Sequence, residues 1–125
     1  MKIFVASILA ALAAAGQASA AEGSADAGKA VFDMKCAMCH ASAPGVRSPV
    51  APNLFGVGQR VSGSSDFAGY SPALKKAAVP WNSKSLDQFL TGPNKMVPGT
   101  RMVITVPDAQ KRADLVAYLV SLKKK

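Results

Sequence analysis

The sequence has 125 residues, a length that fits one small domain. It carries 15 Lys and Arg against 7 Asp and Glu, and this formal charge of +8 favours acidic partners. Its basic residues are not interleaved with aromatic ones as in surfaces that stack nucleic-acid bases, and 2 Cys with 1 His are too few ligands for a zinc ribbon.

The first 20 residues have the three parts of a secretory signal peptide. Lys2 is followed by the apolar run 3–15 and by the small-residue site Ala18-Ser19-Ala20. The run is shorter than the ~20 residues of a membrane span, which argues against the alternative of an uncleaved anchor. We therefore expect a signal peptide over residues 1–20, a mature domain over residues 21–125 and a periplasmic location.

The first helix is predicted from about Asp26 to Ala37, with Ser24 or Asp26 as its cap. At its end lies Cys36-Ala37-Met38-Cys39-His40, the C-x-x-C-H pattern of c-type haem attachment. Two thiols on one turn reach the two vinyl groups at one edge of a porphyrin, and the adjacent imidazole falls beneath the iron. The pattern predicts one haem c, held by two thioethers, with His40 as a metal ligand.

Two other interpretations of the cysteines are weaker. A thioredoxin-like C-x-x-C is typical of a βαβ context, which this sequence lacks. A plain disulfide between Cys36 and Cys39, in an interaction module without haem, would leave His40 and the loop-rich middle of the chain unexplained.

The region from Ala41 to Gly69 is dense in Gly, Pro and Ser and is predicted as a long loop around a ligand. Further helices are expected over residues 71–78, 81–91 and 107–122, the second with a Ser85–Gln88 capping box. Gly92-Pro93 is expected to end that helix, and residues 94–106 to form a loop. No convincing strand pattern is present.

His40 is the only histidine, so a second axial ligand must be Met, Lys, an N-terminal amine, water or nothing. Met34 and Met38 lie too close to the attachment turn to reach the far face of the ring. Met96 and Met102 lie far enough along the chain. Met102 follows the turn Pro98-Gly99-Thr100-Arg101 and is the favoured candidate, whereas Met96 is expected to fill the core.

The mature chain is similar to a class I c-type cytochrome of the mitochondrial and short bacterial type over nearly all of its length. Besides the attachment motif, the resemblance is carried by these landmarks: Gly28, Phe32, Pro52-Asn53-Leu54, Arg60, Tyr70, Trp81, Pro98-Gly99-Thr100-Arg101-Met102 and residues 114–119. It implies an all-α cytochrome c fold with three main helices, a short one, and long loops wrapped around one covalently bound haem.

The resemblance also implies roles for single residues. Met102 would be the distal ligand, the Pro52 carbonyl would hold Nδ1 of His40, and Thr100 would cover the distal loop. The haem propionates would be hydrogen-bonded or neutralised by three residues: Arg60, Tyr70 and Trp81.

Packing roles are implied as well. Gly28 would let the first helix cross the last near Tyr118, with Phe32 in the contact. Phe89 departs from the family pattern, because many relatives have a tyrosine there with its hydroxyl near the methionine sulfur.

The function these features imply is a single-electron carrier, not an enzyme, in electron transport such as a respiratory chain. It would act as a monomer between a bc1-type complex or dehydrogenase and an oxidase, reaction centre or reductase. A basic rim would meet acidic-surfaced redox proteins or membrane complexes: Lys29, Lys35, Lys75, Lys76, Lys95, Arg101 and Lys111. The alternative is a haem peroxidase or gas-binding sensor with a labile sixth ligand.

Overall fold

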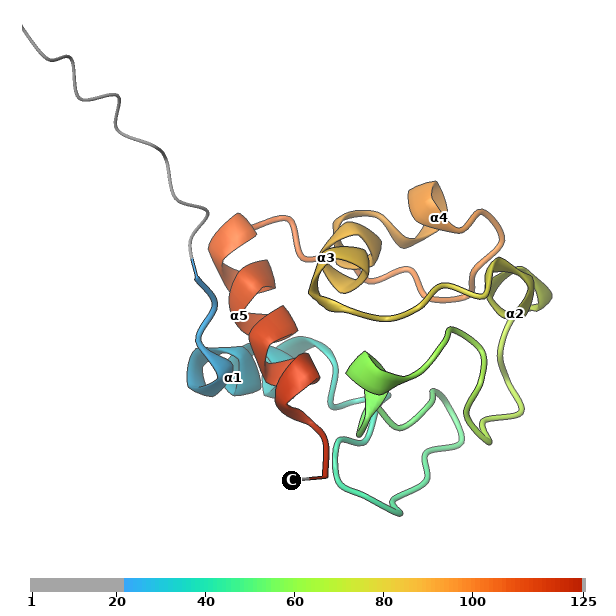
Figure 1. The fold of residues 1–125 in the computed structure, drawn as a ribbon, viewed down its shortest axis with the longest axis horizontal. Coiled ribbons are helices and arrows are strands. Elements are labelled where there is room, and N and C mark those ends of the chain that lie inside the picture. The colour runs from blue at the N-terminus through green and yellow to red at the C-terminus, as the bar shows by residue number, and fades with distance from the viewer. Residues whose placement is uncertain (1–21, 125) are drawn as a thin grey trace, which may run out of the picture.

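The computed structural model describes residues 22–124, and this part of the chain is helical (Figure 1). The expected signal peptide lies outside the described residues. In chain order the elements are α1 (Ala25–Lys35), the 3₁₀ turn η1 (Val57–Gln59), α2 (Pro72–Ala77), α3 (Ser83–Thr91), α4 (Pro93–Met96) and α5 (Ala109–Ser121). No helix among the described residues combines the length and apolar character needed to cross a membrane.

The predicted all-α fold with three main helices is confirmed: α1, α3 and α5 are the long ones. In Figure 1, α1 and α5 cross each other at the left, so that the first and last helices of the described chain are in contact. Gly28 makes the close approach possible, because a Cβ there would overlap the carbonyl oxygen of Asp114 on α5. Beside this point the rings of Phe32 and Tyr118 pack with centroids 5.4 Å apart, as the resemblance implied.

The start of α1 is set by Ser24, whose hydroxyl accepts a hydrogen bond from the backbone N–H of Ala27. Its buried face consists of Gly28, Val31 and Phe32, and the helix ends at Lys35, two residues before the predicted end.

Helix α3 presents Leu86, Phe89 and Leu90 to the core, as predicted from their spacing. Its capping box differs from the prediction: the Asn82 side chain accepts from Ser85 N–H, and the Ser85 hydroxyl accepts from Asn82 N–H. The helix therefore begins at Ser83 rather than Trp81.

Helix α4 was not predicted, since residues 94–106 were expected to be loop throughout. Gly92 ends α3, but Pro93 then occupies the first turn of a new helix, where a residue without an N–H is tolerated. Two short helices, α2 and α4, therefore accompany the three long ones, against the single short helix expected.

The long loop over residues 41–69 is confirmed, interrupted only by η1. Hydrogen bonds from side chains to backbone hold it in place. The Asn53 amide donates to the carbonyls of Ala43 and Val46 at 2.6 and 2.7 Å, and the Ser48 hydroxyl donates to the Cys39 carbonyl at 2.7 Å. The loop therefore has a defined path without regular structure.

A single backbone bridge closes the next loop on itself. Val61 and Pro80 pair in antiparallel fashion, with hydrogen bonds from Ser62 N–H to the Val79 carbonyl and from Trp81 N–H to the Arg60 carbonyl. Residues 62–79, which include α2, thus leave and return at one point. No strand occurs among residues 22–124.

Candidate functional site

The C-x-x-C-H motif lies where α1 ends. Cys36 caps the helix, and a further turn follows in which the N–H groups of Cys39 and His40 both donate to the Cys36 carbonyl at 3.0 and 2.9 Å. This turn brings both thiols and the imidazole to the wall of one cavity. Both cysteines are free thiols, and burial raises the pKa of the Cys36 thiol to about 11.

The orientation of His40 is set by the long loop. Its Nδ1 lies 2.7 Å from the carbonyl oxygen of Pro52. A carbonyl only accepts, so Nδ1 carries the proton and the lone pair of Nε2 is left free. Burial lowers the pKa of His40, which favours the neutral ring that a metal requires.

The segment from Pro98 to Met102 approaches the same cavity from the other end of the chain. Gly99 turns the backbone with a φ of 91°, and Thr100 N–H donates to the Val97 carbonyl at 3.1 Å. The Arg101 guanidinium donates to the carbonyl of Gly69 at 2.7 Å. Thr100 and Met102 both line the cavity as a result.

The cavity has a volume of about 320 Å³ and is mostly apolar. Its wall joins residues from six parts of the chain: Lys35, Cys36, Cys39, His40, Val50, Ala51, Pro52, Leu54, Phe67, Gly69, Tyr70, Ser71, Leu90, Thr100, Arg101, Met102, Val103, Ile104 and Leu119. Of the nine residues named from the sequence, the cavity thus brings together seven.

Arg60 and Trp81 do not belong to this wall. The Arg60 guanidinium donates to the carbonyls of Phe55 and Asn53 at 2.9 and 2.5 Å. The Trp81 ring packs edge-on against Phe89 with centroids 5.0 Å apart. Both residues support the segments that carry the wall, and their contact with haem propionates stays a prediction.

The remaining methionines are distributed largely as expected. Met34 and Met38 are exposed on α1 and the attachment turn, with Met38 94% exposed. Met96 packs half-buried against the hydrophobic core. Among the described methionines, only Met102 lines the cavity.

Several wall residues were missed by the sequence analysis. Val103 and Ile104 are 66% and 44% exposed, which is unusual for large apolar side chains and suits a wall that a ligand covers. Their sequence signal, a short β-branched run, indicated only a weak strand. Phe67 and Ser71 carry no pattern that distinguishes them from ordinary loop residues.

The donors present fit a covalently attached haem. Two thiols, a neutral imidazole and a thioether share one apolar cavity, and these are the groups that bind haem c. Thr100, only 6% exposed, has a hydroxyl oxygen with no hydrogen-bond partner among the described residues. A buried hydroxyl without a protein partner indicates that a polar group of a ligand completes its hydrogen bonding inside the cavity.

Comparison with known proteins agrees with this geometry. The family model described as Cytochrome c matches residues 25–123. Cytochrome c from Euglena viridis is 43% identical over 102 residues, which cover 81% of this chain and 99% of the relative. Cytochrome c from Tetrahymena pyriformis is 45% identical over 102 residues (81% and 91%), and cytochrome c2 from Rhodoblastus acidophilus is 38% identical over 102 residues (81% and 94%).

The matched residues include the attachment turn, the long loop, the turn before Met102 and all six helical elements. The chain therefore belongs to the cytochrome c family and is an electron carrier, not an enzyme, that binds covalently attached haem c.

Proposed function

We propose that this chain is an exported carrier with one haem, which moves single electrons between a bc1-type complex or dehydrogenase and a terminal oxidase, reaction centre or reductase. The observation that carries the proposal is the 2.7 Å hydrogen bond between His40 Nδ1 and the Pro52 carbonyl. It leaves a neutral imidazole with a free nitrogen in the cavity that Met102 also lines.

In this proposal Cys36 and Cys39 would hold the haem through two thioethers, and His40 and Met102 would bind its iron. Bound haem supplies one-electron chemistry at iron, and a His/Met ligand pair raises its potential. Because the chain would supply both of these ligands, no site on the metal would stay open for a substrate. The largely apolar wall excludes water and keeps the cavity's polarity low.

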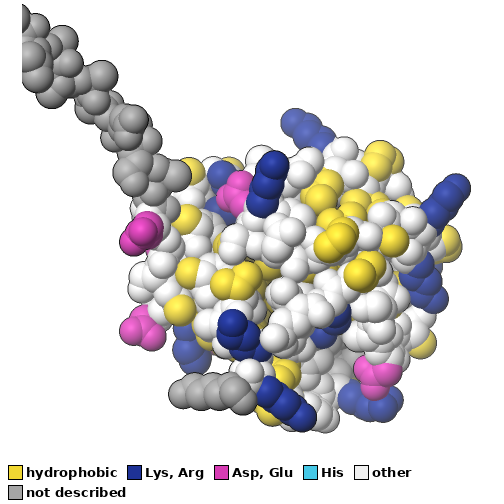
Figure 2. Space-filling model, viewed as in Figure 1, with side chains coloured by type: hydrophobic (Ala, Val, Ile, Leu, Met, Phe, Trp, Pro, Cys, Tyr) yellow, Lys and Arg dark blue, Asp and Glu magenta, His cyan; other side chains and the backbone are white. Residues whose placement is uncertain are grey.

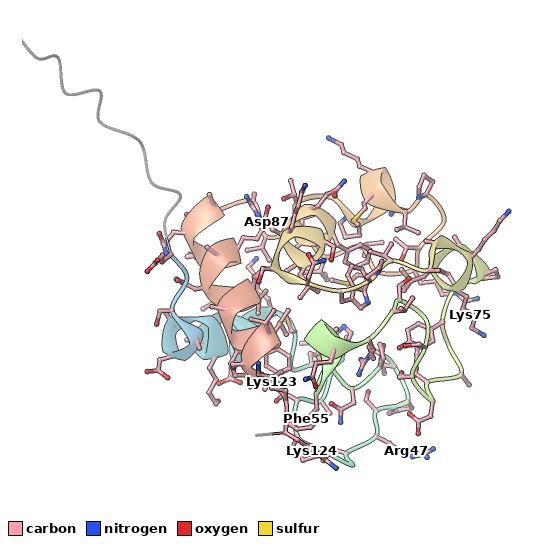
Figure 3. The ribbon with its side chains drawn as sticks, viewed as in Figure 1. Arg47, Phe55, Lys75, Asp87, Lys123 and Lys124 are labelled. Carbon is pink, nitrogen blue, oxygen red and sulfur yellow. The ribbon has the colours of Figure 1, made fainter. Side chains whose placement is uncertain are left out.

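Docking to partners would use the basic residues beside the cavity. Lys35 and Arg101 line it and are exposed, and Lys75 projects from α2 (Figure 3). Lys29 contributes less than expected from the sequence, because Asp33 pairs with it at 2.7 Å. In the view of Figure 2, Lys and Arg side chains stand around much of the surface, and the fewer acidic side chains are seen at the left edge, near the top and at the lower right.

Export rests on the sequence of residues 1–20, which would be removed near Ala20 to leave a domain of residues 21–125. A periplasmic location also supplies the setting in which thioether-bound haem is useful, since loosely held haem would be lost. We propose that the mature protein acts as a monomer in transient encounters with its partners.

The test is the visible spectrum of the holoprotein in both redox states. The ferric protein should show the weak red band of methionine–iron ligation, and Met102→Ala should abolish this band and allow rapid cyanide binding. Met96→Ala is the matched control and should keep the band, because Met96 packs in the core. A band that survives in Met102→Ala would refute the assigned ligand.

A further inference from the structure

Ser65 is joined to the cavity residue Tyr70 by a short hydrogen bond. Its Oγ lies 2.6 Å from the phenol oxygen of Tyr70, and the backbone N–H of Phe67 donates to the same Oγ at 3.4 Å. The three groups form a chain from the loop backbone, through one side-chain hydroxyl, to another. Neither the sequence pattern nor the family resemblance assigned Ser65 a role.

The first link gives this chain a direction. A backbone N–H can only donate, so Ser65 Oγ accepts at that end. Hydrogen bonds in series polarise one another, and a hydroxyl that accepts becomes a better donor. This polarisation favours the arrangement in which Ser65 donates to the Tyr70 oxygen, and in that arrangement the phenolic proton of Tyr70 is left for a further acceptor.

The Tyr70 ring is fixed so that this proton stays near the cavity. Phe67 packs edge-on against it, with centroids 5.3 Å apart and an interplanar angle of 83°. Tyr70 is only 9% exposed and lines the cavity between Gly69 and Ser71. The Arg101 guanidinium, which also lines the cavity, donates a hydrogen bond to the carbonyl of the neighbouring residue Gly69. The segment is thus held by contacts on both sides.

We propose that Ser65 is a positioning residue, which orients the Tyr70 hydroxyl to donate to an anionic carboxylate inside the cavity. In a haem protein the anionic groups are the haem propionates, so the proposal rests on the proposed function. Ser65 itself touches no haem. It acts by fixing which way the phenolic proton points and by withdrawing electron density from the phenol oxygen.

The electrostatic consequence is measurable as the midpoint potential. A propionate that receives a good hydrogen bond has its negative charge partly neutralised, which disfavours the ferric state relative to the ferrous one. Tyr70→Phe removes the donor and should lower the potential. Ser65→Ala leaves the phenol but removes its orienting partner, so it should lower the potential by a smaller amount.

The experiment is an electrochemical titration of four holoprotein variants at one pH: Ser65→Ala, Tyr70→Phe, the double variant and Ser64→Ala. Ser64→Ala is the matched control, because the Ser64 hydroxyl is exposed and donates to the Val61 carbonyl. We expect Ser64→Ala to match the unaltered protein. We expect Ser65→Ala to shift the potential only when Tyr70 is present. Urea unfolding of each variant shows whether a change in the midpoint potential is accompanied by a loss of stability.

Each other outcome is decisive. If Tyr70→Phe lowers the potential and Ser65→Ala does not, the positioning role is overturned while the function stands. An equal Ser65→Ala shift in the Tyr70→Phe background overturns it too, since Ser65 would then act by another route. If Tyr70→Phe leaves the potential unchanged, the contact of Tyr70 with a cavity carboxylate fails, and the role of Ser65 fails with it.

Discussion

Asp114 on α5 accepts a hydrogen bond from the backbone N–H of Ser24, 90 residues earlier in the chain, at 2.8 Å. The same buried carboxylate oxygen accepts from the Gln110 side chain at 3.0 Å. Ser24 is the N-cap of α1, so this contact fixes the start of one terminal helix against the middle of the other.

Asp114→Ala should therefore destabilise the holoprotein by about 1–3 kcal/mol, because it leaves a partly buried N–H without an acceptor. The measurement is urea unfolding followed by tryptophan fluorescence. Asp33→Ala is the control: it removes only an exposed pair with Lys29 and should cost about 0.3–0.5 kcal/mol. Equal losses in the two variants would contradict the role given to Asp114.

Gly28→Ala should prevent α1 and α5 from packing at their present distance. The added Cβ would overlap the Asp114 carbonyl and crowd the Tyr118 Cβ, and we expect a loss of about 1–3 kcal/mol or more. Gly58→Ala is the matched control, since the nearest atoms of Val120 lie 3.4 Å from the new Cβ. It should be neutral or stabilise by about 0.4–1 kcal/mol. Thermal unfolding of both variants checks the pair.

Ala78→Gly should stabilise the protein. Ala78 ends α2 with φ 46° and ψ 44°, the left-handed region that favours glycine. Relief of about 1–2 kcal/mol of strain exceeds the entropic cost of glycine, for a net gain of about 0.5–1 kcal/mol. Ala77→Gly, at the last helical residue of α2, should instead lose up to about 1 kcal/mol. The two thermal midpoints should move in opposite directions, and a fall in both would contradict the argument.

Lys35→Gln should slow the reaction with an acidic redox partner. Two unit charges about 5 Å apart in water interact by about 0.8 kcal/mol, which corresponds to roughly a fourfold rate at low salt. Stopped-flow rates measured against ionic strength test this, and the difference should shrink as salt rises.

Lys111→Gln is the control for this series. Lys111 lies in the first turn of α5, the end next to Gly23 and Ser24, whereas the cavity is lined by Leu119 and by Lys35 at the far ends of α5 and α1. It should leave the rate nearly unchanged. Equal effects of the two variants would show that overall charge, not the rim of the cavity, guides the encounter.

The long helices could be predicted because their apolar residues recur at helical spacing, as Leu86, Phe89 and Leu90 do in α3. The short helices depend on single residues, such as proline, that can either end one helix or begin the next. Gly92-Pro93 predicts the end of a helix, and α3 does end there, but Pro93 also begins α4. The spacing of Ser85 and Gln88 predicts a capping box between them, whereas the structure forms the box between Asn82 and Ser85.

Some residues of the site could likewise be predicted from the sequence and others could not. Cys36, Cys39 and His40 are adjacent in sequence, so their chemistry is visible from spacing alone. Pro52 contributes only a backbone carbonyl, which leaves no mark in the residue type and was named only through the family resemblance. Ser65 reaches Tyr70 because the loop between them turns back on itself. The conformation of an irregular loop has no periodic signal in the sequence.

The bridge between Val61 and Pro80 has an evolutionary consequence. Residues 62–79 leave and return at one point, so a change of length in a part of this segment that does not contact the cavity leaves the flanking segments in place. Doubling a flexible loop's length costs only about 0.6 kcal/mol in closure entropy. Insertions beside the exposed residue Ser64 should therefore be accepted among descendants of this sequence. The stretch from Ser65 to Trp81 holds Tyr70 at the cavity and contains α2, so its length should drift far less.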